Sequence, residues 1–404
     1  MKINFHKLTK KYGTPLYVYN ANKIEYQYKL MKKSFSSIKN FKINYACKAN
    51  TNISILKFLK KLGSGLDTVS IQEVEIGLKA GFQPKEIIYT PNGVSLEEIK
   101  KAIKAGVLIN LDNLSLLEQI GNEKTNYPIG IRITPHIFGG GNKKISVGHI
   151  DSKFGISYYQ LPHIKKIIKN TGIKIEGIHM HTGSDIIDMG VFFQIAERLL
   201  NVANLFKTLK YIDFGSGFKV PYKQSDSKTD LDLLAFFLKK KLSIFFEKNS
   251  SYYKKIKLFF EPGKFLISES GFFLVKVNVI KQTPSTVFAC VDSGFNHFIR
   301  PMFYDSYHQI DNISNPLGKF RFYTVVGYIC ESDTFCVNRP INEIREGDIL
   351  CFRNAGAYCF SMSSHYNSRY KPAEVLIYKK KDFLIRKREN MQDLLNNMFE
   401  IEFN

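Results

Sequence analysis

The chain has 404 residues, of which 44% are hydrophobic, and it carries a formal net charge of +22. This length exceeds that of an ordinary single domain, so we expect two domains. Apolar runs such as 272–275 are far too short to cross a bilayer, and the N-terminus has no apolar leader core, so we expect a cytoplasmic protein with no membrane partner.

The positive charge raises the hypothesis of a nucleic-acid binder, which would be retained on DNA with a steep salt dependence. The lysines are spread along the chain, however, and no nucleic-acid module is recognisable. We favour compositional drift in a Lys-, Ile- and Asn-rich chain and expect no nucleic-acid partner. The six cysteines form no CxxC pair, so no metal site is expected.

Strand-like apolar runs alternate with helix-period segments as far as Glu261. Eight strands are predicted to begin near Ile43, Leu66, Ile87, Val107, Ile129, Ile175, Tyr211 and Leu258. Helices are predicted at 53–62, 71–80, 96–105, 159–170, 192–206 and 231–247. Eight alternating units predict a (β/α)8 barrel of the TIM type, and a doubly wound open sheet is the rival that strand count alone does not exclude.

After Glu261 the pattern changes to short strands separated by Gly, Pro, Asn and Asp turns. Strands are predicted at 272–281, 286–292, 321–328, 348–353 and 373–378, followed by a last helix at 390–399. The early segment 15–19 is also strand-like. We therefore predict a barrel over 25–267 and a mainly β domain over 268–404, completed by residues 1–24.

Lys48 directly follows the apolar run 43–47. A lysine leaving a buried strand is expected to be held away from bulk water, which disfavours its ammonium form. Its amine is then a nucleophile that can form a Schiff base with a carbonyl substrate or with pyridoxal phosphate. One lysine proves little, because a charged residue at a strand end is usually only solvated.

Further polar groups fall at or near the ends of the predicted barrel strands. They are Asp67, Asn92, Arg132, His179, His181, the turn 215–217 and Glu261. Active sites of such barrels are built at the carboxyl ends of the strands. We therefore expect one site on this rim, although Arg132 taken alone is better explained as a structural ion pair.

The types of these residues suit a phosphorylated ring cofactor. His179 and His181 alternate on one strand, and we assign His181 to the site, stacked on a cofactor ring, with His179 as a possible core histidine. The turn 215–217 suits a phosphate, to which Ser184 adds a hydroxyl. Glu261 needs a cationic or hydrogen-bonding partner, either a neighbouring strand's cation or a protonated pyridine nitrogen.

A second group of unusual residues lies in the β domain, at 300–304, 330–333 and 356–358. Free cysteines are most often buried packing residues. Cys330 precedes Glu331 and lies close to Asp333 at the end of a predicted strand, so it is a better candidate for proton transfer than the other five cysteines.

In combination these motifs resemble the alanine-racemase-like, fold-type III family of pyridoxal phosphate-dependent decarboxylases. The motifs are Tyr45–Asn50, Lys153–Gly155, His181–Ser184, Glu261–Lys264, Arg300–Tyr304, Cys330–Asp333 and Gly356–Tyr358. The resemblance runs from about Pro15 to Glu374, nearly the whole chain.

The resemblance implies roles for individual residues. Lys48 carries pyridoxal phosphate covalently, His181 stacks on its ring, and Cys330 is the general acid. The phosphate and ring nitrogen are held by Ser184, Gly217, Glu261, Pro262, Gly263 and Lys264, with Tyr358 near the cofactor. The substrate contacts Lys264, Arg300, Tyr304, Glu331 and Tyr358. Members of the family are homodimers in which the Cys-Glu segment reaches into the partner's site.

The implied reaction is decarboxylation of meso-2,6-diaminoheptanedioate to L-lysine and CO2. Arg300 and Glu331 favour a substrate with a distal carboxylate over ornithine, arginine or carboxynorspermidine, the substrates of sister enzymes. A non-catalytic homologue would typically lack Lys48 or Cys330, and both are present. The chain departs from the family pattern where Lys264 replaces the commoner arginine, and also at Thr182, Asp185, Ser216 and the segment 70–73.

Overall fold

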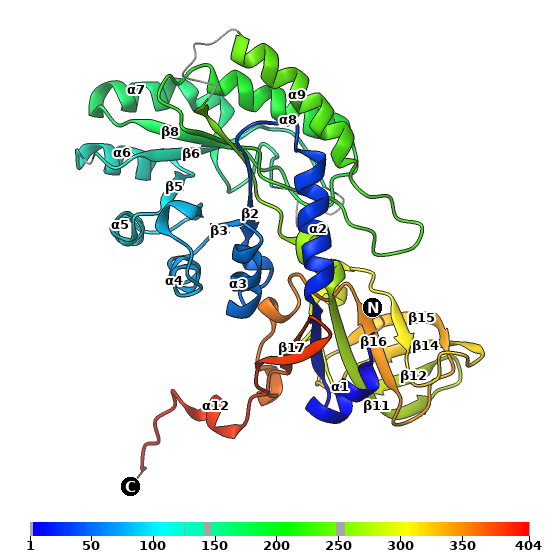
Figure 1. Cartoon of the computed structure of the whole chain (residues 1–404). Coiled ribbons are helices and arrows are strands. Elements are labelled where there is room, and N and C mark those ends of the chain that lie inside the picture. Colours follow the sequence, from blue (N-terminus) through cyan, green and yellow to red (C-terminus); the bar gives the residue numbers. More distant parts are fainter. Residues whose placement is uncertain (1–2, 125, 141–146, 248–254, 404) are drawn as a thin grey trace. The chain divides into compact units, whose positions relative to one another are not determined.

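The computed structural model describes residues 3–124, 126–140, 147–247 and 255–403. The chain divides into two compact units. Figure 1 colours the chain along its sequence, from blue at the N-terminus to red at the C-terminus. One comprises Glu25–Pro221 and Asp226–Leu266, and the other comprises Met1–Ile24, Tyr222–Ser225 and Ile267–Asn404. Each unit is described separately below, and the predicted division into domains 25–267 and 268–404 stays a prediction.

The first unit is a closed barrel of eight parallel strands. They are β2 (Phe41–Ala46), β3 (Gly65–Thr68), β4 (Ile87–Tyr89), β5 (Leu108–Leu111), β6 (Ile129–Thr134), β8 (Ile175–His179), β9 (Tyr211–Asp213) and β10 (Lys257–Phe260). The order is β5-β4-β3-β2-β10-β9-β8-β6, and pairing of β5 with β6 closes the ring. The short β7 (Ile156–Ser157) pairs in parallel with the end of β6. The predicted (β/α)8 barrel is confirmed, and the open sheet is excluded.

Helices connect the barrel strands. They are α2 (Ala21–Ser34), α3 (Ile53–Lys61), α4 (Ile71–Lys79), α5 (Leu96–Ala105), α6 (Leu114–Asn122), α7 (Leu161–Thr171), α8 (Met189–Ala203), α9 (Leu231–Glu247) and α10 (Lys264–Ile267). Side chains of Asn52, Ser70 and Ser95 cap helix starts, and Gly106 and Gly172 end helices in the left-handed conformation. Sequence patterns missed α2 and α6.

The Tyr211 ring fills the middle of the barrel. Its hydroxyl donates to Asn110 Oδ1 at 2.7 Å, and its ring stacks on Phe259 with centroids 5.4 Å apart. A Cβ atom on Gly177 would lie 1.9 Å from Tyr211 Cζ, and one on Gly130 would lie 2.2 Å from the Tyr211 hydroxyl. Strands β8 and β6 therefore need glycine where the Tyr211 ring crosses the interior.

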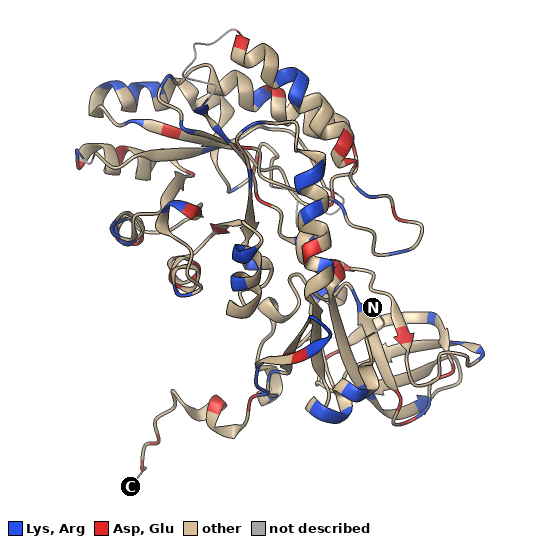
Figure 2. Ribbon diagram, viewed as in Figure 1, with Lys and Arg blue, Asp and Glu red and all other residues tan. Residues whose placement is uncertain are grey.

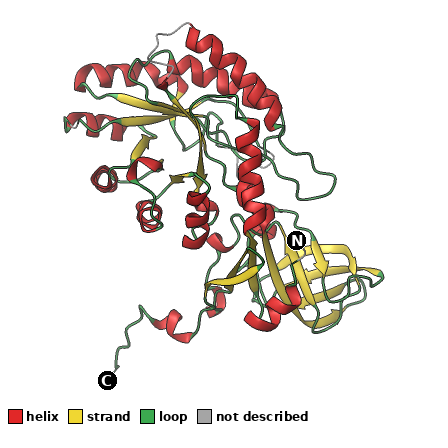
Figure 3. Cartoon of the chain, in the orientation of Figure 1, coloured by secondary structure: helices red, strands yellow, loops and turns green. Residues whose placement is uncertain are grey.

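The second unit is mainly β (Figure 3). Its strands are β1 (Leu16–Asn20), β11 (Gly271–Gln282), β12 (Val287–Val291), β13 (Ile310–Asn312), β14 (Phe320–Val326), β15 (Thr334–Asn342), β16 (Ile349–Arg353), β17 (Ala373–Tyr378) and β18 (Lys381–Arg386). The order is β15-β14-β12-β11-β1-β17-β18, and β16 pairs with β11 and β13. As predicted, the N-terminal strand joins this sheet, where Leu16 and Val18 pack with Leu274 and Val375.

Three short helices complete the second unit: α1 (Phe5–Tyr12), α11 (Arg300–Tyr304) and α12 (Met391–Leu395). The last helix was predicted over 390–399 but ends at Leu395, because two asparagines, which are poor helix formers, follow it. Within the described ranges, no helix is long and apolar enough to cross a membrane. Lysines and arginines occur throughout both units (Figure 2).

The close fit around Tyr211 can be tested with Gly177→Ala. Because the added Cβ would overlap the ring, we expect the free energy of unfolding in urea to fall by roughly 3 kcal/mol. The control is Gly172→Ala, where a Cβ meets nothing within 4 Å but φ is 75°, for which we expect a loss of about 1–2 kcal/mol. Equal losses in the two variants would contradict the steric explanation.

Candidate active site

Buried polar side chains gather at the carboxyl ends of the barrel strands. Asp67 of β3, Arg132 of β6, His179 of β8 and Asp213 of β9 are all buried, as is Glu261 directly after β10. Lys48 lies in a 3-10 turn (Cys47–Ala49) that follows β2. Of the predicted rim residues, Lys48, Asp67, Arg132, His179 and Glu261 thus lie at one end of the barrel.

At the centre of this rim, one histidine and two acids form a cluster. His179 Nε2 lies 3.0 Å from Glu261 Oε2. An imidazole nitrogen of His179 and carboxylate oxygens of Asp213 and Glu261 all lie within 4.8 Å of one another. Asp213 Oδ1 accepts a hydrogen bond from the Gly215 backbone N–H at 2.9 Å. Glu261 has the partner that its burial demanded, so His179 belongs to the cluster and is not merely a core histidine.

The two acids of the cluster hold different charges. Burial alone raises the pKa of Glu261, but His179, a hydrogen bond from Asp213 and the charge of Lys48 outweigh burial and lower the pKa to about 2. Burial and the Glu261 charge raise the pKa of Asp213 well above its usual value. At neutral pH, Asp213 is therefore protonated and donates, while Glu261 is a carboxylate buried at the base of the rim.

Arg132 and Asp67 complete the electrostatics of the rim. Burial lowers the pKa of Arg132, and the charges of Glu261, Asp112 and Asp67 oppose that effect. Burial and Glu261 raise the pKa of Asp67, against which Lys48 acts. The Arg132 guanidinium also lies 4.8 Å from the centre of the Phe154 ring. The charged groups of the rim therefore affect one another's pKa and act as one coupled set.

His181 is fixed beside the glycine turn that was predicted to hold a phosphate. The Ser216 backbone N–H donates to His181 Nδ1 at 3.3 Å. Burial and the positive charges of Lys48 and Arg132 hold the pKa of His181 well below its usual value, so the imidazole is neutral at physiological pH. A flat, neutral ring near Lys48 has the shape and charge that stacking on an aromatic cofactor requires.

The glycine turn packs tightly against the loop that carries Ser184. Gly217 has φ 121°, and a Cβ atom on it would lie 2.6 Å from the Gly183 carbonyl oxygen. The Ile186 backbone N–H donates to the Gly217 carbonyl at 2.9 Å. Only glycine fits at 217, because the conformation is left-handed and the two backbones approach closely.

Two departures from the family pattern turn out to be partners. Lys264 Nζ lies 2.7 Å from Asp185 Oδ2, and the side chains are 6% and 18% exposed. Asp185 has φ 61°, a left-handed conformation that aspartate tolerates better than most residues. A buried lysine at 264 thus has a carboxylate beside it, a contact across 79 positions that the sequence did not predict.

Our expectation that Lys48 is withheld from water is wrong, because its side chain is exposed in the described chain. Strand β2 ends at Ala46, and the following turn buries Cys47 and Ala49 but leaves Lys48 at the surface. Its positive charge nevertheless acts on the pKa of His181, Asp67 and Glu261. Lys48 therefore lies above the buried cluster.

In the second unit, Cys330 is exposed and held by residues that the sequence analysis missed. Asn367 Nδ2 donates to Cys330 Sγ at 3.1 Å, and Asn367 Oδ1 accepts from the Cys330 backbone N–H at 3.1 Å. The Tyr366 hydroxyl donates to Glu331 Oε1 at 2.7 Å, a bond that raises the pKa of Tyr366. The tripeptide 366–368 is a separate turn with no sequence signal linking it to the cysteine.

Arg300 is buried in the same unit, with its guanidinium over two tyrosine rings. Its centre lies 5.4 Å from the Tyr304 ring and 5.8 Å from the Tyr222 ring. Its Nη2 donates to Ser306 Oγ at 3.2 Å. Tyr358 is partly buried with φ 57°. Arg300 and Tyr304 were predicted together and lie together, whereas Tyr222 was not predicted.

Comparison with known proteins agrees with this fold. Residues 21–268 match the pyridoxal-binding domain of pyridoxal-dependent decarboxylases. The chain is 38% identical to diaminopimelate decarboxylase of Methanothermobacter thermautotrophicus, over 96% of this chain and 92% of that one. The enzyme of Aquifex aeolicus is 33% identical, over 99% and 95%. The crystal structure of diaminopimelate decarboxylase from Helicobacter pylori complexed with L-lysine aligns with TM-score 0.88 and 31% identity, over 97% and 98%.

A barrel of this kind with a mainly β second unit is the architecture of an amino-acid decarboxylase that uses pyridoxal phosphate. The chain belongs to the pyridoxal-dependent decarboxylase family, within its diaminopimelate decarboxylase branch. Its cofactor is pyridoxal phosphate.

The opposite charge states of Glu261 and Asp213 predict opposite pH dependences of stability. The folded-state pKa of Glu261, about 2, lies below its usual 4.5, so its stabilisation is present above pH 4.5 and is lost as pH falls toward 2. Glu261→Gln should therefore cost about 3 kcal/mol near pH 7 and progressively less below pH 4.5. Urea unfolding across this range measures the difference.

Asp213→Asn is the matched variant, because the amide keeps a donor toward Glu261. The folded-state pKa of Asp213 is raised above its usual 3.8, so wild type loses stability as pH rises above that value, and the asparagine variant does not. We expect the variant to gain stability relative to wild type between about pH 4 and pH 7. A loss at pH 7 matching that of Glu261→Gln would contradict the assignment of the proton to Asp213.

Proposed function

We propose that this chain converts meso-2,6-diaminoheptanedioate to L-lysine and CO2 with bound pyridoxal phosphate. The observation that carries the reaction type is the buried, ionised Glu261 on the same rim as Lys48. The substrate is supported by similarity over nearly the whole chain to diaminopimelate decarboxylases, and by the structure of one of them complexed with L-lysine.

The residues of the rim fit the cofactor. Glu261 is a buried, ionised carboxylate, so it suits a protonated pyridine nitrogen. Bound pyridoxal phosphate supplies the electron sink for the pair of electrons left when CO2 departs. The Lys48 amine would hold the aldehyde carbon, His181 the ring face, and Ser184 and Gly217 the phosphate. Pro262, Gly263 and Lys264 directly follow Glu261 in the turn after β10, and are proposed to hold the cofactor with it.

The remaining steps need a proton and a substrate clamp. When the carboxylate leaves, its bonding electrons stay on the α-carbon, and the Cys330 thiol donates a proton to that carbon as general acid. Tyr366 holds the Glu331 carboxylate, which suits the distal amino group of the substrate. Arg300, Tyr304 and Tyr358 would contact the distal end, where the guanidinium pairs with the carboxylate.

The assembly is proposed to be a homodimer with shared sites, and the resemblance to the family supports this. Cys330 is exposed on the described chain, as a residue that serves a second chain must be before assembly. Each site would then combine Lys48 of one subunit with Cys330 of the partner subunit. A cytoplasmic location stays a prediction.

Lys48→Ala tests the covalent attachment. We expect wild type treated with borohydride to carry the reduced cofactor on the peptide that contains Lys48, as measured by mass spectrometry, and the variant to lose both the label and CO2 release. Lys57→Ala, which removes an exposed lysine of the barrel, should keep both. A labelled and active Lys48→Ala protein would end the proposal.

The same assay decides the substrate. CO2 release from meso-2,6-diaminoheptanedioate should exceed release from ornithine or arginine by a large factor, roughly 10⁴, because a substrate without the distal carboxylate leaves Arg300 unmatched. Comparable release from ornithine would favour the sister decarboxylases.

Shared sites predict complementation between two inactive variants. Lys48→Ala and Cys330→Ala should each be nearly inactive, the latter by about 10²–10⁴-fold. When both are co-expressed, random pairing gives mixed dimers with one intact site each, so turnover should return to about one quarter of wild type. No recovery in a mixture shown to contain mixed dimers would place Cys330 in the site of its own chain.

A further inference from the structure

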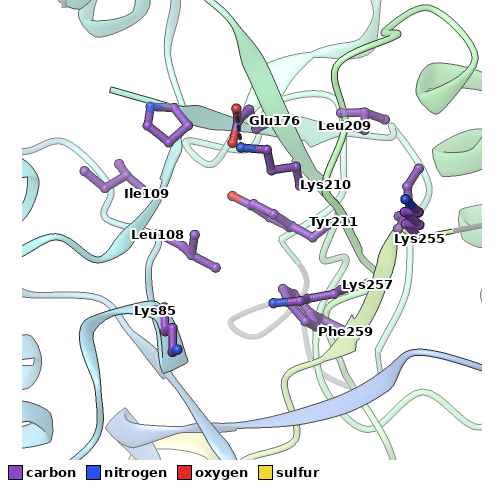
Figure 4. A pocket seen from close by; sticks show the side chains of 12 residues that line it. Lys85, Leu108, Ile109, Glu176, Leu209, Lys210, Tyr211, Lys255, Lys257 and Phe259 are labelled. Atoms are coloured by element: carbon purple, nitrogen blue, oxygen red, sulfur yellow. Dashed lines mark ion pairs between the residues drawn. The ribbon is translucent and has the colours of Figure 1, made fainter. Parts of the chain in front are cut away.

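A pocket of about 350 Å³ opens at the amino ends of the barrel strands, opposite the rim that holds Glu261 (Figure 4). Its lining includes Leu108, Tyr211 and Lys257, the first residues of β5, β9 and β10. The volume lies within the range of small-molecule sites, about 300–1,000 Å³. Neither the cofactor nor the proposed substrate uses this end of the barrel.

The floor of the pocket is apolar and aromatic. Tyr211 and Phe259 pack with Ile88, and Leu108 covers them. Along β10, side chains alternate between the two faces of the strand. Lys257 therefore points to the same face as Phe259, which lies inside the barrel. At this end of the barrel, the last inward-facing residue of β10 is therefore Lys257, a charged residue rather than an apolar one.

The lining of the pocket carries an excess of positive charge. Four lysines line it, namely Lys85, Lys210, Lys255 and Lys257. The one acid in the lining, Glu176, already pairs with Lys210 at 2.7 Å. Figure 4 shows Lys257 extending over Phe259 toward the side on which Lys85 lies.

The pKa of the nearby Lys42 is affected by this concentration of positive charge. It pairs with Phe259 in the β2–β10 register, so it lies at the level of the pocket floor. Burial lowers the pKa of Lys42, and the charges of Lys257 and Lys85 lower it further while Glu86 opposes them. Like charges placed so close destabilise one another, and an anion bound between them relieves that repulsion.

We propose that this pocket binds a small organic anion, with its carboxylate between Lys85 and Lys257 and its apolar body on Tyr211 and Phe259. Ammonium groups are compact donors that bind carboxylates as point charges. The aromatic floor suits a ring or a short hydrocarbon chain. The Tyr211 ring, enclosed by Gly130 and Gly177, separates this site from the catalytic rim.

Calorimetric titration of the cofactor-loaded protein with benzoate, and with its uncharged analogue benzamide, tests the proposal. We expect benzoate to bind with a Kd on the order of 1 mM and benzamide at least about tenfold more weakly. Lys85→Gln and Lys257→Gln should each weaken benzoate binding by about tenfold. Benzoate binding should also weaken as salt is added.

Lys104→Gln is the matched control, because it removes an exposed lysine from α5 and should leave benzoate binding unchanged. Benzoate that binds Lys85→Gln/Lys257→Gln as tightly as wild type binds elsewhere, the catalytic rim included, and overturns the proposal. So does benzamide that binds as well as benzoate, or no benzoate binding up to about 10 mM. CO2 release by the same variants, which should stay at the wild-type level, reports separately on the decarboxylase.

Discussion

A carboxylate kept ionised in the interior of the barrel is the constraint on which the rest of the site depends. Glu261 is only 7% exposed, and burial without partners would neutralise it. The protein prevents this with an imidazole at 3.0 Å and with a second carboxyl that keeps its own proton. A ring nitrogen placed there meets a negative charge at neutral pH, which is what an electron-withdrawing pyridinium needs.

The other groups on the rim follow from that one charge. Arg132 and Lys48 supply positive charge around the carboxylate, and burial together with that positive charge lowers the pKa of His181 and keeps it neutral. Changing one member would therefore shift the protonation of several others, because the low dielectric of the interior leaves them poorly screened. The barrel contributes by bringing to one end residues that lie on, or directly after, six different strands.

Much of this architecture could be predicted from the sequence. The eight strands stood out because buried parallel strands are short apolar runs between helices, and the rim residues stood out because they are polar where such runs end. The resemblance to a family then assigned roles, as at Lys48 and Cys330. What the sequence could not show were contacts between distant positions.

Two particular misses have that origin, and two others are local. The pairing of Lys264 with Asp185 joins two loops that no local pattern connects, and the same holds for Asn367 beside Cys330. The exposure of Lys48 depends on a turn that begins at Cys47, one residue earlier than the apolar run 43–47 indicated. Helix α6 was missed because it ends in Gly-Asn, both poor helix formers.

Strand β9 has a consequence for how the two ends of the barrel communicate. It is three residues long, with Tyr211 at one end and Asp213 at the other, both directed inward. Only Ile212 separates the two residues along the strand, so the backbone links the pocket floor directly to the buried acid. A ligand that displaces the Tyr211 ring in the pocket can therefore shift the Asp213 carboxyl at the other end of the strand. The ligand itself need not enter the active-site end of the barrel.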